Sequence, residues 1–351
     1  MLTRRSLRVR AAAAALALTG AVAAHADNAS LSDIDYRLGS GLQIPGTGWT
    51  LGGYATVSYD DLSDDVSHES PRLNLDNFSL FIWWEGDSRW KFFSEIEYEN
   101  FSRARRESGG KDDYLSLERM YVDYALNDIA TIRGGKFLTP IGRWNLIHAT
   151  PLVWTTSRPL VTTLAFPTNM TGLMVTGNVP AIAGGMEYSL YGAGTEDLRS
   201  NPDQNPFLAA VGGRVLFPIG REAQLGFSYS NFELSQPRYD RKHLYGADFF
   251  WTHSRFELSA EGIYRWADDS GRWDEKGGYV QLAAPLTEKL FAVGRAEVFR
   301  TSLQADATQL STVGLNYRIR PALVLKAEWV EARHNTAHAP DGFLSSISVL
   351  F

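Results

Sequence analysis

The chain has 351 residues, a formal net charge of −6 with histidine neutral, and no cysteine. Without cysteine it forms no disulfide and no thiolate metal site, and it has no cysteine to carry a lipid anchor. The acidic excess argues against nucleic acid as a partner, because nucleic-acid-binding proteins carry basic patches or stripes.

The N-terminus has the pattern of a secretory signal peptide. A positive region precedes an apolar run over 11–24 and a small-x-small cleavage pattern at 24–26. The positive residues are Arg4, Arg5, Arg8 and Arg10. We therefore predict export and removal of residues 1–26. Removing these four Arg leaves 30 basic against 40 acidic residues, a net charge of −10.

A period of two in hydrophobicity runs from Trp49 to Phe351, after a polar stretch over 27–48 that we expect to be a periplasmic lead-in. Alternation of this kind is typical of half-buried strands. Sixteen strands are predicted, at 49–60, 72–85, 88–101, 114–126, 128–138, 169–178, 182–193, 206–217, 221–232, 239–252, 254–267, 274–284, 288–301, 308–319, 321–333 and 342–351. No apolar run of 18 or more residues follows the signal, so we expect no membrane-spanning helix.

The predicted connections alternate between tight turns and longer polar loops. Gly86-Asp87 and Asn127-Asp128 are tight turns, whereas 61–71 and 102–113 are long and polar. Short turns on the periplasmic side and longer loops outside are typical of outer-membrane barrels. A soluble β-sandwich has no reason to alternate in this way.

The predicted strands carry one apolar and one polar face. In 308–319, for example, Val313 and Leu315 alternate with Thr312 and Asn316. Lipid accepts the apolar face and a water-filled interior accepts the polar one, and strands in lipid must close because an open edge leaves amides unsatisfied. The 10 Trp, 15 Tyr and 18 Phe also fit such a barrel, whose aromatic residues collect at both interfaces. The sequence thus predicts an all-β fold, a 16-stranded antiparallel transmembrane β-barrel over 49–351.

The connection over 138–168, between the fifth and sixth strands, is too long and too apolar for an exposed loop. We expect it to fold inward and to narrow the barrel. Arg143, His148 and Arg158 lie in it and are the candidates for a pore constriction, where charges act strongly on permeating ions. Alternatively, the two Arg pair with carboxylates of the wall and hold the loop, and His148 is a hydrogen-bonded packing residue.

Charged residues alternate along the polar face of three neighbouring predicted strands. The lumen-wall candidates are Glu95, Glu97, Glu99, Arg119, Asp123 and Arg133. Cross-strand neighbours lie about 5 Å apart, so pairs between Glu and Arg form readily. An acidic row opposite a basic row would set up a transverse field, and the alternative is a solvated salt-bridge network. Further candidates of mixed sign are Lys91, Glu187, Arg214, Asp248, Arg295 and Glu297.

The last strand, GFLSSISVLF, alternates apolar residues and ends on Phe351. It resembles the C-terminal signature of bacterial outer-membrane proteins, in which a terminal Phe is the assembly signal. The segment GKFLTPIG at 135–142 resembles the strand end and turn of phosphate-selective-type porins. That resemblance implies a 16-stranded, often trimeric diffusion channel in the outer membrane. It does not imply phosphate selectivity here, because the predicted lumen is not rich in Lys and Arg.

These patterns favour a porin that passes small hydrophilic solutes or ions by passive diffusion and contacts outer-membrane lipid. One alternative is a plugged barrel that serves as a scaffold or sheath for a partner protein or exported polymer. Another is an outer-membrane lipid hydrolase, but the S-x-x-K match at 88–91 sits at a tight turn and we interpret it as chance. No cofactor, metal or catalytic residue is predicted.

Overall fold

The structure is a computed structural model. It describes residues 35–63, 71–86, 88–99, 114–147, 149–194, 197–198, 204–236, 240–268, 274–301 and 306–351. In this part of the chain the wall consists of sixteen strands, β3 to β18, and each is paired antiparallel with its neighbour in sequence. Their bounds are β3 Trp49–Leu62, β4 Arg72–Glu85, β5 Trp90–Glu99, β6 Tyr114–Asn127, β7 Ala130–Leu138, β8 Asn169–Val179, β9 Met186–Ala193, β10 Phe207–Ile219, β11 Ala223–Leu234, β12 Arg241–His253, β13 Phe256–Ala267, β14 Glu275–Pro285, β15 Leu290–Arg300, β16 Thr308–Arg320, β17 Leu323–Arg333 and β18 Gly342–Leu350.

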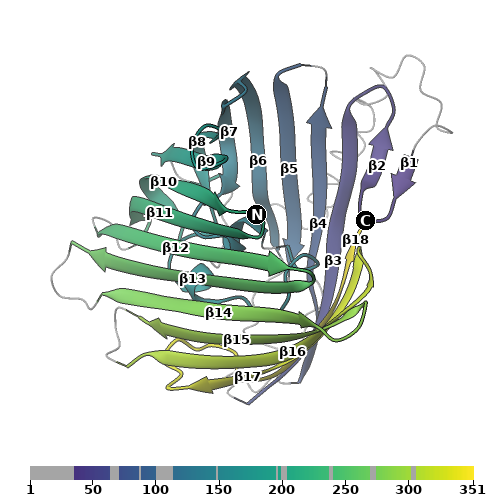
Figure 1. The fold of residues 1–351 in the computed structure, drawn as a ribbon, viewed down its shortest axis with the longest axis vertical. Helices are drawn as coiled ribbons and strands as arrows, with labels where there is room; N and C mark the ends of the chain where they lie inside the picture. Colours follow the sequence, from purple (N-terminus) through teal and green to yellow (C-terminus); the bar gives the residue numbers. More distant parts are fainter. Residues whose placement is uncertain are drawn as a thin grey trace, which may run out of the picture.

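The last strand of the wall pairs with the first. β18 lies antiparallel to β3, with Gly342 opposite Leu62 and Leu350 opposite Tyr54. In Figure 1, β4–β7 stand upright and β12–β17 run across the view, as expected where strands tilt strongly around a closed wall. The prediction of a closed 16-stranded antiparallel barrel is therefore confirmed.

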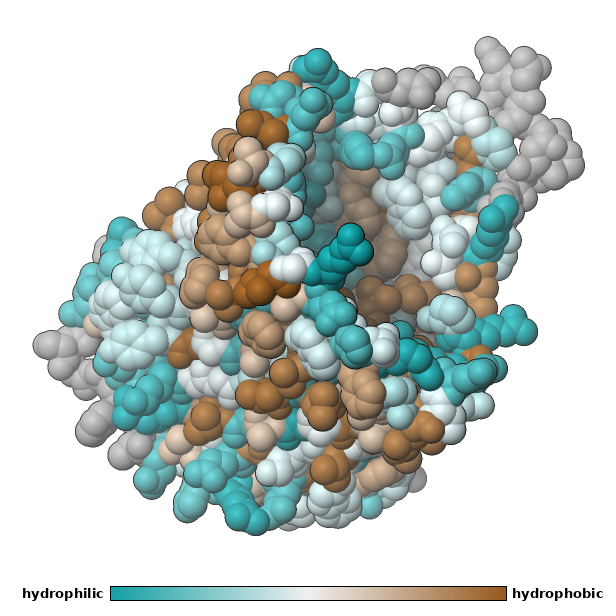
Figure 2. All heavy atoms as spheres, viewed as in Figure 1, coloured by the Kyte–Doolittle hydropathy of each residue, from teal (hydrophilic) through white to brown (hydrophobic). Residues whose placement is uncertain are grey.

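The two faces of the wall differ as alternation requires. Large apolar side chains lie exposed on the outer face, for example Leu173 at 66% and Val313 at 64% exposure, whereas Thr312 and Asn316 on the inner face are buried. Figure 2 shows hydrophobic residues gathered over the outside of the wall and a hollow that opens beside them, with hydrophilic residues at its rim.

The described part of the lead-in, residues 35–48, contains strands that its sequence does not predict. Two short strands, β1 Asp35–Arg37 and β2 Gly41–Ile44, form a hairpin. β2 pairs with Trp49–Leu51, the part of β3 that lies beyond its pairing with β18. Runs of three and four residues are too short for a period of two to appear, so the sequence alone does not predict them.

The long connection between β7 and β8 contains two short helices, α2 Trp144–Ile147 and α3 Leu160–Leu164. α3 lies beside β13, β14 and β15. Among the described residues, no helix is both long and apolar enough to cross a membrane. We call residues 139–168 the inner segment, because its contacts described below are with the inner face of the wall.

Candidate functional site

The two ends of the inner segment are joined at its base. The Thr139 amide donates to the Thr168 carbonyl at 2.9 Å, and the Thr139 hydroxyl donates to the Pro167 carbonyl at 2.7 Å. The buried Asn145 amide group donates to the carbonyls of both Thr139 and Thr168 at 2.9 Å. Gly142 has a φ of +65°, and a Cβ there would collide with the Glu261 carboxylate. The turn therefore depends on this glycine to bring the segment against the wall.

Three buried carboxylates of the wall accept hydrogen bonds from the backbone of the inner segment. Glu261 of β13 accepts from the amides of Arg143 and Trp144 at 3.1 and 2.6 Å. Glu328 of β17 accepts from the amides of Thr156 and Ser157 at 3.0 and 2.7 Å, and Glu297 of β15 accepts from the Leu160 amide at 2.8 Å. A buried carboxylate needs several donors to offset its desolvation, and here the segment supplies them.

Cations of the same strands bind the segment's carbonyl and hydroxyl oxygens. Arg295 of β15 donates to the Thr155 hydroxyl at 2.6 Å and to the Ser157 hydroxyl at 2.7 Å. Lys326 of β17 donates to the Thr155 carbonyl at 3.1 Å. Arg295 is itself paired with Glu297 at 2.6 Å. Anionic and cationic groups thus hold the inner segment from one side of the barrel.

Apolar side chains fill the space between the segment and this side of the wall. The buried cluster joins Phe137, Trp144, Val161 and Phe166 to inward-facing residues of β8 to β17. The wall residues include Phe207, Phe232, Leu244, Phe299, Leu310 and Val330. Hydrogen bonds join residues 140–166 to β11, β13 and β15–β18. Together with the apolar cluster, they attach the segment to the β8–β18 side of the wall.

The predicted constriction residues occupy different surroundings. Arg143 donates to the Gln224 side chain at 2.9 Å and lies 3.6 Å from the centre of the Phe250 ring. Burial lowers the pKa of Arg143 from its ordinary value, and the charges of Glu257 and Asp248 oppose that shift. Arg158 lies over the Trp144 ring at 4.9 Å, within the segment itself.

His148 lies outside the described residues, so the structure does not place the third constriction candidate.

The predicted lumen-wall residues form ion pairs on β5, β6 and β7, on the opposite side of the barrel. Glu95 pairs with Arg119 at 2.5 Å across β5 and β6, in the register that places these two residues opposite each other. Asp123 of β6 accepts two hydrogen bonds from Arg133 of β7, at 2.7 and 2.8 Å. Glu97 is buried and accepts a long hydrogen bond, 3.5 Å, from the Tyr54 hydroxyl.

Glu99 ends β5 opposite Tyr114, and its side chain lies outside the described part of the chain.

An arc of aromatic rings continues these pairs along the inner wall. Tyr54, Phe81, Phe93 and Tyr121 come from four neighbouring strands, and successive ring centres lie 5.7, 5.8 and 5.5 Å apart. The Arg119 guanidinium lies 4.6 Å from the Phe93 ring centre, and that of Arg133 lies 3.7 Å from the Tyr121 ring centre. Ring and carboxylate together fix the orientation of each guanidinium.

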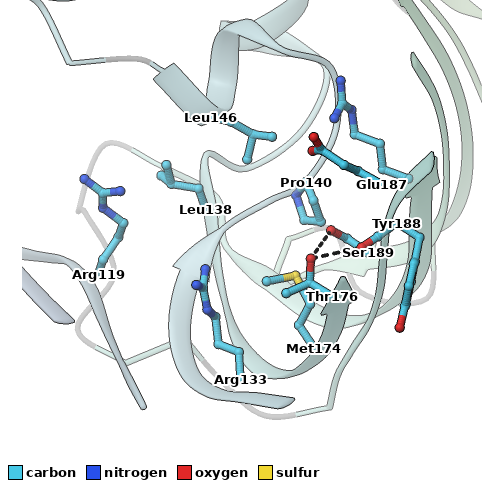
Figure 3. Close-up of a pocket in the computed structure, with 11 residues that line it drawn as sticks. Arg119, Arg133, Leu138, Pro140, Leu146, Met174, Thr176, Glu187, Tyr188 and Ser189 are labelled. Atoms are coloured by element: carbon cyan, nitrogen blue, oxygen red, sulfur yellow. Dashed lines mark hydrogen bonds between the residues drawn. The ribbon is translucent and has the colours of Figure 1, made fainter. Parts of the chain in front are cut away.

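A cavity of about 270 Å³ lies between this wall and the start of the inner segment. Arg119, Arg133, Glu187 and Arg214 supply its charged groups. Leu138, Pro140, Leu146 and Met174 supply apolar surface, and Thr176 and Ser189 supply hydroxyls that bond to each other at 3.1 Å. Figure 3 shows the side chains of Arg119 and Arg133 on one side of Pro140 and that of Glu187 on the other.

Alternation in the sequence correctly predicts that most of these charged residues lie on the inner face of the wall. It does not predict that several of them bind the inner segment. Glu261, Lys326 and Glu328 follow the same alternation as any inward residue, and no local signal marks them as contacts of the segment. Glu118 was missed for another reason. A bulge in β6 interrupts the alternation, so that the neighbours Glu118 and Arg119 both face inward. Glu118 is buried, and its carboxylate accepts a hydrogen bond from the Asn169 side-chain amide at 2.9 Å.

Within the described residues, no group of three or more His, Asp or Glu side chains is placed to hold a metal ion. No family model matches the chain. An uncharacterised protein of Aquifex aeolicus (strain VF5) is 23% identical over 358 residues, which cover 87% of this chain and 80% of that protein.

Several solved porin structures share the architecture. The Salmonella typhi OmpF complex with daunomycin aligns with a TM-score of 0.63 at 12% identity, over 87% of this chain and 98% of OmpF. The anion-selective porin from Comamonas acidovorans aligns at 0.58 and 12% identity, over 87% and 98%. The outer-membrane channel DcaP of Acinetobacter baumannii aligns at 0.56 and 13% identity, over 89% and 100%. The chain therefore has the fold of outer-membrane porins, and a particular subgroup such as the phosphate-selective type is not established.

Proposed function

We propose that the protein is an outer-membrane porin through which small hydrophilic solutes or ions diffuse passively. The observation that carries the proposal is the one-sided attachment of the inner segment. The segment forms hydrogen bonds with β11, β13 and β15–β18 and packs on β8–β17, whereas the ion pairs and aromatic rings of β3–β7 face the interior beside it. An interior of this kind holds water along one side of a closed wall.

The inner segment sets the size of the passage in this proposal. Its contacts with the wall include five backbone amides bound to buried carboxylates, so the segment has a fixed position rather than a choice of several. Solutes pass between it and the wall of β3–β7, where Glu95, Arg119, Asp123 and Arg133 orient water and act on charged solutes. No bond of the solute changes.

Export, membrane location and assembly belong to the same proposal. Cleavage after Ala26 would release the chain into the periplasm, and Phe351 at the end of the last strand would act as the assembly signal. The exposed apolar outer face, with Leu173, Val280 and Trp329 on it, suits a lipid environment. A homotrimer is proposed as well, from the likeness to the trimer form of OmpT, an outer-membrane protein of Vibrio cholerae.

Swelling of proteoliposomes tests the proposal. Purified full-length protein is reconstituted into vesicles, which are then diluted into isotonic solutions of uncharged sugars of increasing size. We expect the rate of swelling to fall steeply with solute size, because the gap beside the inner segment limits passage. Vesicles that swell no faster than protein-free vesicles with every sugar would reject passive diffusion and leave a plugged barrel.

A further inference from the structure

The cavity beside the start of the inner segment is lined by charged side chains whose hydrogen-bonding groups are not all bound to other residues of the wall. Arg119 bonds Glu95 through Nε only, Arg133 bonds Asp123 through Nε and Nη2, and Arg214 bonds Asp248 through the same two nitrogens. Within the described residues, the remaining guanidinium nitrogens have no hydrogen-bond partner, and all three side chains line the cavity. Each Arg is thus held in place and still has N–H groups to offer.

Glu187 is the acidic residue of the cavity lining, and it has no partner among the described residues. Its side chain is exposed to the interior on β9, between the turn that precedes Met186 and the buried Tyr191. Figure 3 places its carboxylate across Pro140 from Arg119 and Arg133. A donor side and an acceptor side therefore face the same space.

The charges that line the cavity nearly cancel, so they disfavour the binding of a solute that carries only one sign of charge. The three Arg are offset by Glu95, Asp123 and Asp248, which hold them, and Glu187 adds a further negative charge. A free anion would meet Glu187, and a free cation would meet the exposed N–H groups. A solute that carries both charges a short distance apart satisfies both sides.

Apolar surface lies between the two charged sides. Leu138, Leu146 and Met174 line the cavity there, and its 270 Å³ is near the lower end of the range of about 300–1,000 Å³ for small-molecule sites. We propose that this cavity is a binding site for zwitterions with a small apolar side chain, that is, apolar α-amino acids. The carboxylate binds Arg119 and Arg133, the ammonium group binds Glu187, and the side chain packs on Leu138 and Met174. The inference rests on the proposed function, because the cavity would lie on the route of diffusion.

Binding of four matched probes tests the inference. L-leucine carries both charges, 4-methylpentanoate lacks the ammonium group, 3-methylbutylamine lacks the carboxylate, and glycine lacks the side chain. Isothermal titration of detergent-purified full-length protein is expected to give a dissociation constant on the order of 1 mM for L-leucine, weak enough for a permeating solute to leave. The other three probes should each bind about tenfold more weakly or worse, because each loses one charged or apolar contact.

Two substitutions assign the roles. Glu187→Gln should weaken L-leucine about tenfold without weakening 4-methylpentanoate, whereas Arg133→Gln should weaken both. Glu222→Gln changes an exposed carboxylate that pairs with His253 at the β10–β11 turn, and it should change neither. If Arg133→Gln does not fold, the comparison of Glu187→Gln with the unmodified protein is sufficient to test the inference. The Glu187 side chain has no hydrogen bond or ion pair with another described residue, so we expect this variant to fold.

The outcomes separate this inference from the proposed function. Equal binding of L-leucine and 4-methylpentanoate, no binding of L-leucine, or an unchanged L-leucine affinity in Glu187→Gln would overturn the inference. If vesicles then still swell in sugar solutions, the porin proposal stands without a zwitterion site. If L-leucine binds in detergent but vesicles do not swell, the site exists and the passive-diffusion proposal fails.

Discussion

Phe351 and Gly53 exchange two backbone hydrogen bonds, each 2.9 Å long, where the last strand meets the first. The Phe351 ring stacks on Phe78 with ring centres 5.5 Å apart, in the space that a side chain at residue 53 would occupy. A Cβ on Gly53 would lie 2.9 Å from the Phe351 ring and 2.0 Å from the Ser79 carbonyl oxygen. Closure of the barrel therefore depends on a terminal ring and on a glycine nearly 300 residues away in sequence.

We expect Gly53→Ala to impair closure. The added methyl group forces the seam apart or displaces the Phe351 ring, so the folded fraction should fall severalfold. Folded and unfolded barrels separate on SDS gels of unheated samples, and the ratio of the two bands gives this fraction. Gly294→Ala is the matched control, because a Cβ at Gly294 of β15 meets nothing within 4 Å. Equal folding of the two variants would contradict the seam described above.

A disulfide can test where the inner segment lies. The hydroxyl oxygens of Thr156 and Ser346 are 2.9 Å apart, which places the two side chains within reach of a disulfide. The chain has no cysteine of its own, so the double variant Thr156→Cys, Ser346→Cys forms no competing bond. We expect a cross-link after mild oxidation, detected as a mobility shift that a reductant reverses.

The wall itself supplies a positive control for that experiment. Thr56 and Ser348 face each other across the seam with hydroxyl oxygens 3.1 Å apart, so Thr56→Cys, Ser348→Cys should cross-link in the same conditions. A cross-link in the wall pair and none in the segment pair would show that the segment does not lie against β18.

Glu328 should anchor the inner segment. Its carboxylate accepts hydrogen bonds from the Thr156 and Ser157 amides, and bonds to a charged group contribute about 1.5–3 kcal/mol each. Glu328→Ala should lower the unfolding temperature in detergent and add rapid fluctuations to the open-channel current. Glu331→Ala on the same strand removes an exposed carboxylate paired with Arg333 and should do neither. Equal unfolding temperatures and equal current fluctuations in the Glu328→Ala and Glu331→Ala variants would contradict the role of Glu328 in anchoring the inner segment.

Arg143 should influence ion selectivity. Its guanidinium is on the inner segment, close to the charges of Glu257 and Asp248. Arg143→Glu should raise the permeability ratio of cation to anion severalfold, and Arg143→Gln should give an intermediate value, because the local positive charge is first removed and then reversed. Reversal potentials under a salt gradient measure the ratio. Arg241→Gln, at a pair with Glu233 at the far end of β12, should leave it unchanged.

The strands could be predicted because alternation is a local property. Val313 and Thr312 reveal their faces from their own residue types, and sixteen such runs fix the barrel. The bulge at Glu118 could not be predicted, because it depends on the pairing of β6 with β5. The hydrogen bonds that attach the inner segment to the wall could not be predicted either. Glu261, for example, accepts from the Arg143 amide, and the two residues are 118 positions apart in the sequence.

Single-channel recording of the unmodified full-length protein in planar bilayers shows whether the closed wall and its inner segment leave a water-filled passage along one side. We expect discrete current steps of uniform size that scale linearly with voltage and rise with salt concentration. Correctly folded protein that inserts into the bilayer and gives no current steps would contradict this expectation.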